Sequence, residues 1–596
     1  GAIYSKEKTV FRLWAPLASK VVLKLKKPGF AYDYLKMKRI EKGVFELEIA
    51  GDLDGAEYLY EETNNEVSVE SIDPYAKGST ENGRSSVVLD FDSLSVKKEK
   101  ESLKTLNEYI DSVIYEGNVR DLTIGRHTNI KNKGKYLGLI EENRTTEDGH
   151  PAGIGYFKML GFTHIQLLPI NDFKTVDELN PDKTFNWGYD PAQYFVPEGS
   201  YSTDPKDPKS RIVEVQQMVQ GFHKAGIRVV LDVVFNHVYE YLTSSFEKTT
   251  PNYWFRKTKE GKMANTSWCG DDVATEKPMV RKMILDAARW WIDYYDIDGF
   301  RCDLMGILDV ETVNAFARIG KAKDPSFMVY GEGWNMGGDV NVPLANMDNH
   351  KLMPDVAFFN DFYRESVKRY ISGDGYAKED FKYSFLGSSS EWWGKGPKFD
   401  NINKTINYVE CHDNWTYHDY LENVKGQQSQ IERLNRCKLA LASVLLSFGI
   451  PFIHAGEETG QSKFGVENSY KSGDSINKFS WALLDQRWDM ALFFKDLIKL
   501  RKSIAPLNSS SFFPSLKKCD FSSDDDCVFV YLSYEKDDKN DYKMTIILNP
   551  TNSNMNYTFD GDQTLIFTSG GLASSTNTRV TNVLIPKQSF VIVDNK

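Results

Sequence analysis

Two acidic residues of this 596-residue chain, Asp303 and Glu332, could together cleave a covalent bond. They lie 29 positions apart, and Asp303 belongs to a short charged segment. Residues 299–306 contain Arg301 and Asp303, and Glu332 follows within Val-Tyr-Gly-Glu-Gly-Trp. Each carboxyl ends a short apolar run, as expected where buried parallel strands deliver side chains to a barrel mouth. Splitting a glycosidic bond needs such a pair, one carboxylate to attack the sugar carbon and one acid to protonate the leaving oxygen. A structural salt bridge is the alternative for each residue taken alone.

Two further segments place polar residues at the ends of apolar runs. Residues 232–238 read Asp-Val-Val-Phe-Asn-His-Val and close the run that starts at Ile227. Residues 409–416 read Val-Glu-Cys-His-Asp-Asn-Trp-Thr and close the run that starts at Thr405. The four strand-end segments together gather three carboxyl candidates, two histidines and an arginine. Their agreement favours a catalytic site over a structural ion-pair network.

In this order and context the four segments resemble the signature regions of the alpha-amylase superfamily of glycoside hydrolases. The resemblance implies that Asp303 is the nucleophile, Glu332 the acid/base and Asp413 the stabiliser of the transition state. It also implies that Arg301 holds Asp303 ionised and correctly aimed. The two residues that it assigns to hydroxyls of the reacting sugar are His237 and His412.

A heptad between two of the apolar runs narrows the resemblance to one branch of the superfamily. Residues 185–191, Phe-Asn-Trp-Gly-Tyr-Asp-Pro, resemble the heptad of type I pullulanases, which usually begins with Tyr. Segments 135–141, 151–154 and 165–169 and the Leu-Met pair after Asp303 fit the same subfamily.

The resemblance covers nearly the whole chain, most sharply residues 113–485, and three positions depart from it. Phe185 lacks a phenol hydroxyl, and Asn118 stands where relatives generally carry a titratable histidine. Asp272 follows Asp271 where relatives usually have Asn, which adds a like-charge pair beside a substrate loop. None of the three is a proposed catalytic acid.

Aromatic and polar residues near these segments are candidates for holding a glucan. We expect Tyr189 to stack under the reacting sugar, because an aromatic face suits the axial hydrogens of a pyranose; turn packing beside Pro191 is the alternative. Trp187 fits either a sugar platform or local packing. Trp334, two positions after Glu332, is expected to line the leaving-group side, with loop packing as the alternative. The loop after the last barrel strand adds two residues that resemble a glucan-contacting segment of pullulanases, Asn468 and Asp474.

Hydrophobic periodicity divides the chain into three folded parts. Residues 1–95 alternate apolar and polar over short runs, which predicts a β-sandwich. Residues 11–16, Phe-Arg-Leu-Trp-Ala-Pro, resemble the start of the carbohydrate-binding-like module that precedes the barrel in debranching enzymes. Its role is open between packing and glucan binding. Residues 96–112 predict a charged linker, and residues 506–596 predict a C-terminal antiparallel β-sandwich. Between them, residues 113–505 alternate strands and amphipathic helices, the order of parallel beta-alpha units.

The central part supplies the eight strands that close a TIM barrel, so the predicted fold class is multidomain α/β with a central (β/α)8 barrel. The signature segments follow the third, fourth, fifth and seventh strands, which puts them on one face. Residues 238–275 show few periodic patterns and predict a long insertion after the third strand. The strand candidates lie near Val113, Thr163, Arg228, Asp296, Phe327, Val356, Thr405 and Pro451.

Charge and composition exclude several classes of partner. The formal net charge is −11 without a dominant basic cluster, so nucleic acid is not an expected partner. The longest apolar stretch, residues 439–456, is interrupted by Gly449 and Pro451, so no membrane span is predicted. The histidines lack zinc-site spacing and retaining glycoside chemistry needs no Lewis acid, so no catalytic metal or other cofactor is expected. Structural calcium remains an open alternative.

The cysteines and the first residues bear on compartment. Six cysteines show no CxxC spacing and are expected to be reduced, with a Cys519–Cys527 bridge as the alternative in a secreted protein. The residues after Gly1 lack a basic region followed by an apolar run, so a cytoplasmic location is expected, with secretion as the alternative if a leader has been removed. A monomer is expected.

The resemblance therefore implies a retaining debranching hydrolase that cuts alpha-1,6 links in pullulan, branched dextrins, starch or glycogen. One alternative is an isoamylase-like or alpha-1,4-acting glucan hydrolase or transferase, because such enzymes share the same acids. A non-catalytic glucan-binding protein is the other alternative. The presence of all three carboxyls, Asp303, Glu332 and Asp413, argues against it.

Overall fold

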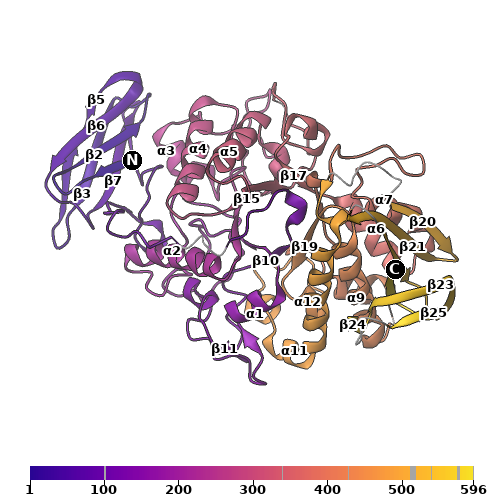
Figure 1. Ribbon diagram of the computed structural model, residues 1–596. Helices are drawn as coiled ribbons and strands as arrows, with labels where there is room; N and C mark the ends of the chain where they lie inside the picture. The colour runs from indigo at the N-terminus through magenta and orange to yellow at the C-terminus, as the bar shows by residue number, and fades with distance from the viewer. Residues whose placement is uncertain are drawn as a thin grey trace.

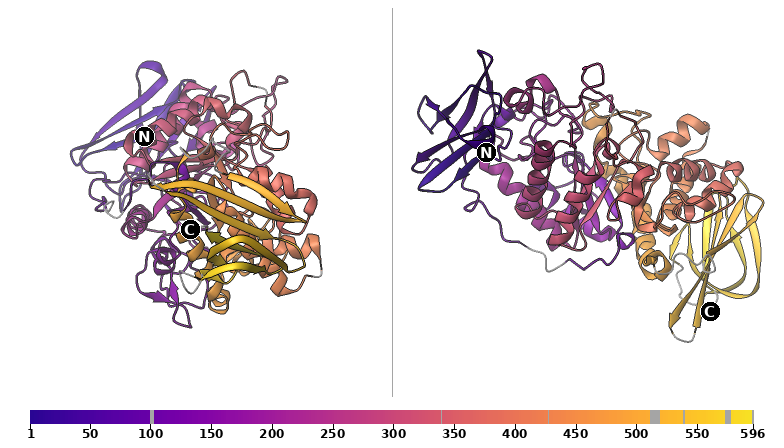
Figure 2. Two further views of the ribbon diagram at one scale, coloured as in Figure 1. Left: turned by 45° about the vertical axis from the view of Figure 1, so that its right-hand side comes forward. Right: turned by 90° about the horizontal axis from the view of Figure 1, so that it is seen from above.

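The computed structural model describes residues 1–98, 103–338, 340–426, 428–510, 519–537, 540–572 and 578–594. Residues 99–102 of the predicted linker lie outside the described residues. A central barrel carries an antiparallel β module on each side, and the two modules lie at opposite ends of the molecule (Figures 1 and 2). This arrangement confirms the predicted fold class.

The N-terminal module consists of two antiparallel sheets around a common core. Along β2 (Lys8–Trp14), Thr9, Phe11 and Leu13 are buried and their neighbours are more exposed, which is the period-two pattern of a strand with one covered face. Tyr58 and Tyr60 of β7 (Glu57–Asn64) belong to the same core as Phe11 and Leu13. One sheet contains β1 (Ala2–Tyr4), β2 (Lys8–Trp14), β6 (Val44–Ala50) and β5 (Lys38–Arg39). The other contains β4 (Tyr32–Lys36), β3 (Lys20–Lys26), β7 (Glu57–Asn64), β8 (Val67–Ser71) and β9 (Ser86–Val87).

Eight parallel strands close the central barrel, at the eight predicted places. Every residue of its third strand is buried, because parallel strands are covered by side chains inside the barrel and by helices outside it. In closed order the strands are β10 (Ile114–Gly117), β13 (His164–Leu167), β14 (Arg228–Val233), β15 (Gly299–Cys302), β16 (Met328–Gly331), β17 (Ala357–Phe359), β18 (Thr405–Asn407) and β19 (Ile450–His454).

Polar caps set the starts of several helices. Asp207 accepts a hydrogen bond from the Lys209 amide and Pro208 opens α2, while Ser429 and Glu432 form a capping box on α9. The helices are α1 (Ile154–Leu160), α2 (Pro208–Lys224), α3 (Ser245–Thr249), α4 (Pro278–Asp293), α5 (Val310–Lys323), α6 (Asp361–Ile371), α7 (Lys378–Phe385), α8 (Tyr417–Lys425), α9 (Gln430–Leu446), α10 (Asp474–Asn477), α11 (Trp481–Gln486) and α12 (Trp488–Ser503). A small ribbon pairs β11 (Arg144–Thr145) with β12 (Pro151–Ala152).

The C-terminal module is an antiparallel sheet with two apolar faces. Val528 and Val530 of β21 join the core that extends from the barrel, whereas Phe529 belongs to a separate cluster on the opposite face. This alternation explains why the sequence shows apolar residues on consecutive positions here. The strands are β20 (Cys519–Asp524), β21 (Cys527–Asp537), β22 (Asn540–Asn549), β26 (Ser589–Asp594), β23 (Met555–Thr568) and β24 (Gly571–Leu572), with β25 (Arg579–Ile585) paired to β23.

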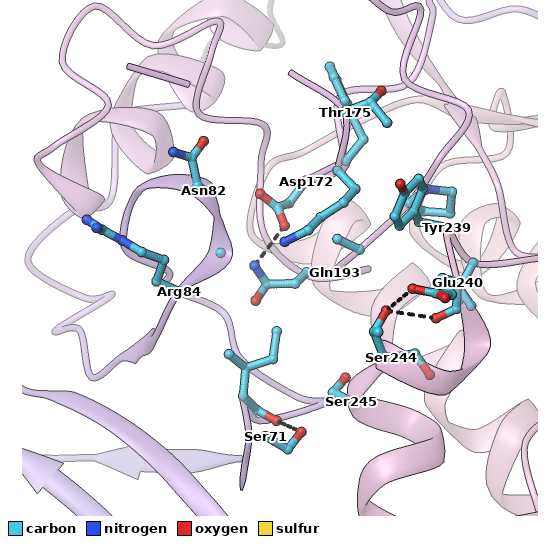
Figure 3. A pocket seen from close by; sticks show the side chains of 18 of the residues that line it. Ser71, Asn82, Arg84, Asp172, Thr175, Gln193, Tyr239, Glu240, Ser244 and Ser245 are labelled. Atoms are coloured by element: carbon cyan, nitrogen blue, oxygen red, sulfur yellow. Dashed lines mark hydrogen bonds between the residues drawn. The ribbon is translucent and has the colours of Figure 1, made fainter. Parts of the chain in front are cut away.

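A cavity of about 710 Å³ lies where the N-terminal module meets the barrel (Figure 3). The segment at Asn82 and Arg84 lines one side, and the loop at Tyr239 and Ser244 lines another. Asp172, which accepts a hydrogen bond from the Gln193 amide at 2.8 Å, also lines it.

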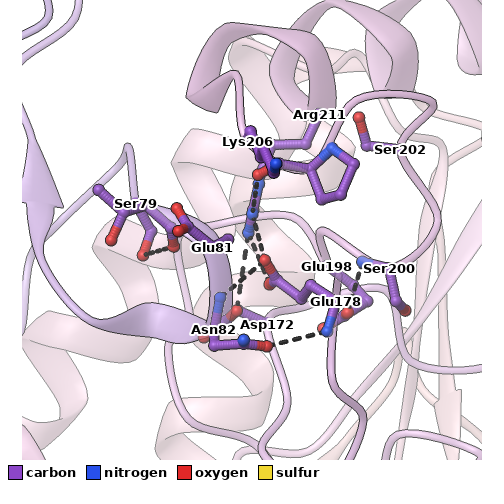
Figure 4. A network of polar contacts seen from close by, with 12 residues as sticks. Ser79, Glu81, Asn82, Asp172, Glu178, Glu198, Ser200, Ser202, Lys206 and Arg211 are labelled. Atoms are coloured by element: carbon purple, nitrogen blue, oxygen red, sulfur yellow. Dashed lines mark hydrogen bonds and ion pairs between the residues drawn. The ribbon is translucent and has the colours of Figure 1, made fainter. Parts of the chain in front are cut away.

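A buried ion pair fastens this junction (Figure 4). Arg211 of α2 donates to both carboxylate oxygens of Glu178, at 3.0 and 2.6 Å. The Asn82 backbone amide donates to the same carboxylate at 2.8 Å, and the Asn82 side chain accepts from the Glu178 amide at 2.8 Å. Two more buried carboxyls, those of Asp172 and Glu198, complete the acidic cluster. The N-terminal segment is therefore bonded directly to a loop of the barrel.

All six cysteines lie within the described ranges, and none of them forms a disulfide there. Among the helices of the described ranges, none combines the length and the apolar composition that crossing a bilayer requires.

Candidate active site

The four signature segments meet at one face of the barrel. Three of them follow neighbouring strands, and the fourth follows β18, which ends at the same face. Asp232 of β14 lies beside Arg301 of β15 in the sheet register, and Arg301 lies beside Tyr330 of β16. Asp303 and Glu332 each come directly after one of these strands. Parallel strands all present their carboxyl ends to one face, so these polar groups converge there.

Arg301 is the charged centre of the site. Its Nη1 donates to Asp232 at 3.0 Å and to Asp303 at 3.1 Å, and its Nη2 lies 3.0 Å from Oε1 of Glu332. Burial alone would lower the pKa of Arg301, but the surrounding carboxylates hold it well above its ordinary value. One guanidinium therefore stays charged and fixes both principal carboxyls on the same side of the pocket.

Asp303 is held at both carboxylate oxygens. Oδ1 accepts from Arg301, and Oδ2 accepts from the Asn236 side-chain amide at 2.8 Å. The same amide donates to the Asp303 carbonyl at 2.8 Å. The next residue, Leu304, has a φ of +40°, an unusual conformation for a branched side chain. It lets the Leu304 amide donate to Oε2 of Glu332 at 3.0 Å, which links the two carboxyls through the backbone.

The environment of Glu332 suits an acid that keeps its proton. Burial raises its pKa, and the nearby charges of Asp303 and Asp413 act in the same direction, while Arg301 opposes them. A raised pKa lets a carboxyl act as a proton donor near neutral pH. Asp413 is more open, with 45% of its side chain exposed. The two carboxyls therefore differ in environment, as distinct roles require.

Glu116 is a functional candidate that sequence reasoning missed. It is the penultimate residue of β10, is buried, and accepts hydrogen bonds from the backbone amide of His412 and from its Nδ1, both at 2.8 Å. Nε2 of His412 lies 3.5 Å from the Asp413 carboxylate. Burial alone would lower the pKa of His412, but Asp413 and Glu116 raise it to about 9. A carboxyl at the end of an apolar strand was the available signal.

The two heptad aromatics form a wall with this histidine. The Tyr189 ring stacks on His412 with centroids 5.1 Å apart, and its hydroxyl donates to Asp232 at 2.7 Å. The Trp187 ring meets His412 edge-on at 5.0 Å and is buried. Trp187 therefore packs behind the site, which is one of its two predicted roles, while Tyr189 remains partly exposed in the wall itself.

His237 is bonded to protein groups at both ring nitrogens. Nε2 lies 2.8 Å from the Tyr189 carbonyl, and Nδ1 pairs with the Asn236 side-chain oxygen. In this arrangement the imidazole links the loop after β14 to the backbone of the heptad. A sugar hydroxyl would have to replace the Tyr189 carbonyl to receive the predicted hydrogen bond.

A cleft of about 290 Å³ opens over these groups. Glu332, Asp413 and Trp334 line it, and the predicted contact of Trp334 on the leaving-group side stays a prediction. The predicted pair on the last loop lies elsewhere, since the described lining of the cleft includes neither residue. Asp474 instead accepts two hydrogen bonds of 2.7 Å from Arg120, and Asn468 is exposed. The other lining residues are Glu116, Arg301, Phe359, Asp361, Arg364, Tyr408, Cys411 and Asn414.

Two protein-family models match the chain. Residues 1–76 match carbohydrate-binding module 48 (isoamylase N-terminal domain), and residues 145–269 and 269–487 match the alpha amylase catalytic domain. The pullulanase of Bacillus subtilis strain 168 is 39% identical over 562 residues, which cover 92% of this chain and 77% of that protein. Isoamylase 3 of Oryza sativa subsp. japonica is 30% identical over 478 residues, covering 70% of this chain and 57% of that protein.

Solved structures give the same result over the whole chain. The type I pullulanase of Bacillus subtilis, complexed with maltose, matches with a TM-score of 0.95 and 36% identity, covering 100% of this chain and 85% of that one. The pullulanase of Anoxybacillus sp. LM18-11, complexed with maltotetraose, has a TM-score of 0.93 and 34% identity, covering 100% and 87%.

The fold and the site together define a glycoside hydrolase of the alpha-amylase family. Its four strand-end segments and its N-terminal module agree with that class throughout. The chain belongs to the type I pullulanases of this family, which are alpha-1,6 debranching enzymes.

Proposed function

We propose that the chain hydrolyses alpha-1,6 links of pullulan and branched dextrins with retention of anomeric configuration. The observation that carries this proposal is the single guanidinium of Arg301 bonded to both Asp303 and Glu332. Retaining enzymes hold their two carboxyls about 5–5.5 Å apart, too close for water between them. Relatives solved with maltose and maltotetraose support an alpha-glucan as the ligand.

The first step forms a covalent sugar–enzyme bond. An oxygen of Asp303 attacks the anomeric carbon while Glu332 gives its proton to the glycosidic oxygen, so the carbon–oxygen bond breaks and the leaving chain departs with a new hydroxyl. Asp413, whose side chain is 45% exposed, stabilises the positive charge that develops on the sugar ring. The protonated ring of His412 beside it can donate from Nε2 to a sugar hydroxyl.

The second step restores the enzyme. Glu332, now a carboxylate, takes a proton from water, and the resulting hydroxide attacks the anomeric carbon from the face that the leaving chain vacated. Asp303 leaves as a carboxylate, so the product keeps the alpha configuration. Arg301 stays bonded to both carboxyls through the cycle and compensates the charge that moves between them.

Digestion of pullulan tests the proposed linkage. Maltotriose should be the main product, and proton NMR at early times should show its new reducing end in the alpha form. Panose or isopanose would show cleavage at alpha-1,4 links and contradict the proposal. Cleavage of glycogen without cleavage of pullulan would favour the isoamylase-like alternative.

Two substitutions test the assigned acids. Asp303→Asn and Glu332→Gln should each lower kcat on pullulan by about 10²–10⁴-fold or more, because one removes the nucleophile and the other the proton donor. Circular dichroism and the melting temperature should show that both variants fold. A folded Glu332→Gln enzyme with near-wild-type turnover would remove Glu332 from the mechanism.

A further inference from the structure

Two aromatic side chains near the mouth of the barrel combine exposure with an unfavourable backbone conformation. Trp268 is 88% exposed with a φ of +63°, and Phe464 is 75% exposed with a φ of +57°. Left-handed backbone is rare for bulky residues and lowers the stability of the fold. A ring in water gains no burial free energy that would offset this cost. The conformation of neither residue is therefore explained by packing.

Trp268 is held beside the catalytic acids by a tight turn. The Cys269 amide donates to the Ser267 hydroxyl at 3.1 Å, and the same hydroxyl donates to the Gly270 carbonyl at 3.2 Å. At the base of the loop, the Thr266 amide donates to Asp272 at 2.9 Å. The structure thus fixes the turn that projects the indole outward.

The turn rests directly on an active-site residue. A side-chain carbon added at Gly270 would lie only 3.1 Å from Cδ2 of His237, so the backbone passes against that ring. The thiol of Cys269, next to Trp268, feels the charges of all three catalytic carboxyls: its pKa is raised by burial and by Asp303, Asp413 and Glu332. The loop that carries Trp268 therefore packs against His237, and the indole itself lies beyond the residues that line the 290 Å³ cleft.

Phe464 is held in the same way from the loop after β19. The Lys463 ammonium donates to the His412 carbonyl at 3.2 Å and lies 5.2 Å from the centre of the Trp187 ring. On the other side, the Trp415 indole donates to the Gly465 carbonyl at 3.0 Å. Both neighbours of Phe464 are thus bonded to residues that surround Asp413, and the ring itself faces solvent.

The two loops flank the heptad. In the closed barrel β19 and β14 enclose β10 and β13, and the heptad with Tyr189 belongs to the loop that follows β13. The exposed rings therefore stand on either side of the wall that faces the reacting sugar. An aromatic face is flat, apolar and electron-rich, which matches the axial C–H groups of a glucose ring.

We propose that Trp268 and Phe464 are stacking platforms for glucose units of an alpha-glucan at the rim of the active-site cleft. The proposal rests on the proposed function, because the glucan that is cleaved is taken as the ligand. The rings would bind units that lie beyond those touching Asp303 and Glu332. A long substrate reaches both platforms, whereas a short one does not.

Substitution by asparagine separates the ring from the backbone conformation. Asparagine tolerates positive φ, so Trp268→Asn and Phe464→Asn remove each ring without adding strain. Each variant should raise KM for pullulan about 3- to 10-fold, the range that corresponds to one lost aromatic contact. The melting temperature should stay the same or rise. The conservative variants Trp268→Tyr and Phe464→Tyr keep an aromatic ring at each position and should therefore keep most of the affinity for pullulan.

Substrate length and a distant ring supply the controls. The increase in KM of each asparagine variant should be several-fold larger for pullulan than for a tetrasaccharide made of two maltose units joined by an alpha-1,6 bond. Tyr376→Ala removes a ring that is 98% exposed on the turn between α6 and α7, at the end of α6 away from Asp361, and should change neither KM. Wild-type cleavage of pullulan, measured first, tests the proposed function separately.

Three results would overturn the rim platforms. One is an unchanged KM for pullulan in both asparagine variants. Another is an equal loss on pullulan and on the tetrasaccharide, which would place the rings at the reacting sugar. The third is a clear fall in melting temperature, which would make the rings structural. Electrophoresis in gels that contain glycogen compares glucan binding by the variants and the wild type, because binding slows the migration of the protein. This comparison does not depend on which bond the enzyme cuts.

Discussion

At the scale of single residues, the site is organised by hydrogen bonds that run between strand ends. Arg301 joins three carboxylates, and Asn236 fixes the one that attacks. The family resemblance assigned Arg301 to Asp303, and the spacing of two positions on one strand agrees with it because both side chains then share a face. The contacts that Asp232 and Asn236 make were not predicted. Catalysis here depends on orientation as much as on residue type.

Other contacts could not be read from the sequence. Tyr189 was expected to offer its ring face to the sugar, yet its hydroxyl also donates to Asp232 and its ring lies against His412. These partners come from three different strands or loops, so their approach depends on closure of the whole barrel. The hydroxyl contact implies that Tyr189→Phe would not be silent, because Asp232 would lose a buried donor.

Glu116 should control the charge of His412. In Glu116→Gln one of the two negative partners of His412 is lost while Asp413 remains, so the pKa of this histidine should fall from about 9. If protonated His412 binds the sugar, the alkaline limb of kcat/KM against pH should move down by about one unit or more. Activity should be lost more at pH 8 than at pH 6.

A second buried glutamate gives a matched control. Glu410 pairs with Nδ1 of His454 at 3.0 Å, and neither residue is assigned to the substrate. Glu410→Gln should leave the alkaline limb in place even if it lowers stability. A pH profile that is identical for wild type and Glu116→Gln would show that the Glu116–His412 pair has no role in substrate binding.

At the scale of elements, the strand pattern was the most predictable feature. Alternation in the N-terminal module and fully buried strands in the barrel follow from whether one or both faces of a strand are covered. Loop conformation was less predictable, because it depends on distant partners. Arg120 and Asp474 are an example, since their ion pair joins loops more than 350 positions apart, and it engages a carboxyl that the sequence assigned to glucan.

Strand β7 contains a buried acid that should make the stability of the N-terminal module depend on pH. Glu62 is fully buried, and in the described part of the chain neither of its carboxyl oxygens has a hydrogen-bond partner. Burial raises its pKa to about 8. Because the folded pKa exceeds the unfolded value near 4.3, stability is fully present at low pH and is lost as pH rises from about 4 through 8.

Replacing this acid by its neutral isostere should remove that dependence. Glu62→Gln should raise the melting temperature at pH 8 and leave it nearly unchanged at pH 4, corresponding to about 2–4 kcal/mol between the two pH values. Differential scanning calorimetry of both proteins across this range measures the effect. Parallel curves for the two proteins would show that Glu62 does not titrate between these pH values.

At the scale of the whole molecule, the N-terminal module is attached to the barrel by specific polar contacts as well as by packing. Thr250, just after α3, donates to the Trp14 carbonyl at 3.1 Å, and Trp14 meets Tyr253 edge-on at 5.1 Å. Asn82 and Glu178 exchange two backbone-to-side-chain hydrogen bonds across the same junction. The module is therefore positioned near the loops that follow β13 and β14, which also carry the heptad and Trp268.

Arg211 should be essential to this junction, because it is the buried cation paired with the acidic cluster of Glu178, Asp172 and Glu198. Arg211→Met keeps much of the side-chain volume but leaves those carboxyls without their counter-charge, at an expected cost of about 3–5 kcal/mol near neutral pH. The deficit should shrink at pH 5, since burial raises the pKa of Asp172 to about 7 and that of Glu198 well above its ordinary value, so both carboxyls are protonated there and the penalty for buried charge falls. Thermal unfolding at pH 5 and pH 8 measures both effects. Lys224→Ala is the control, because it removes an exposed ion pair at the end of the same helix. This variant should melt at almost the same temperature as the wild type. An Arg211→Met protein that melts with the wild type at both pH values would show that packing alone holds the junction.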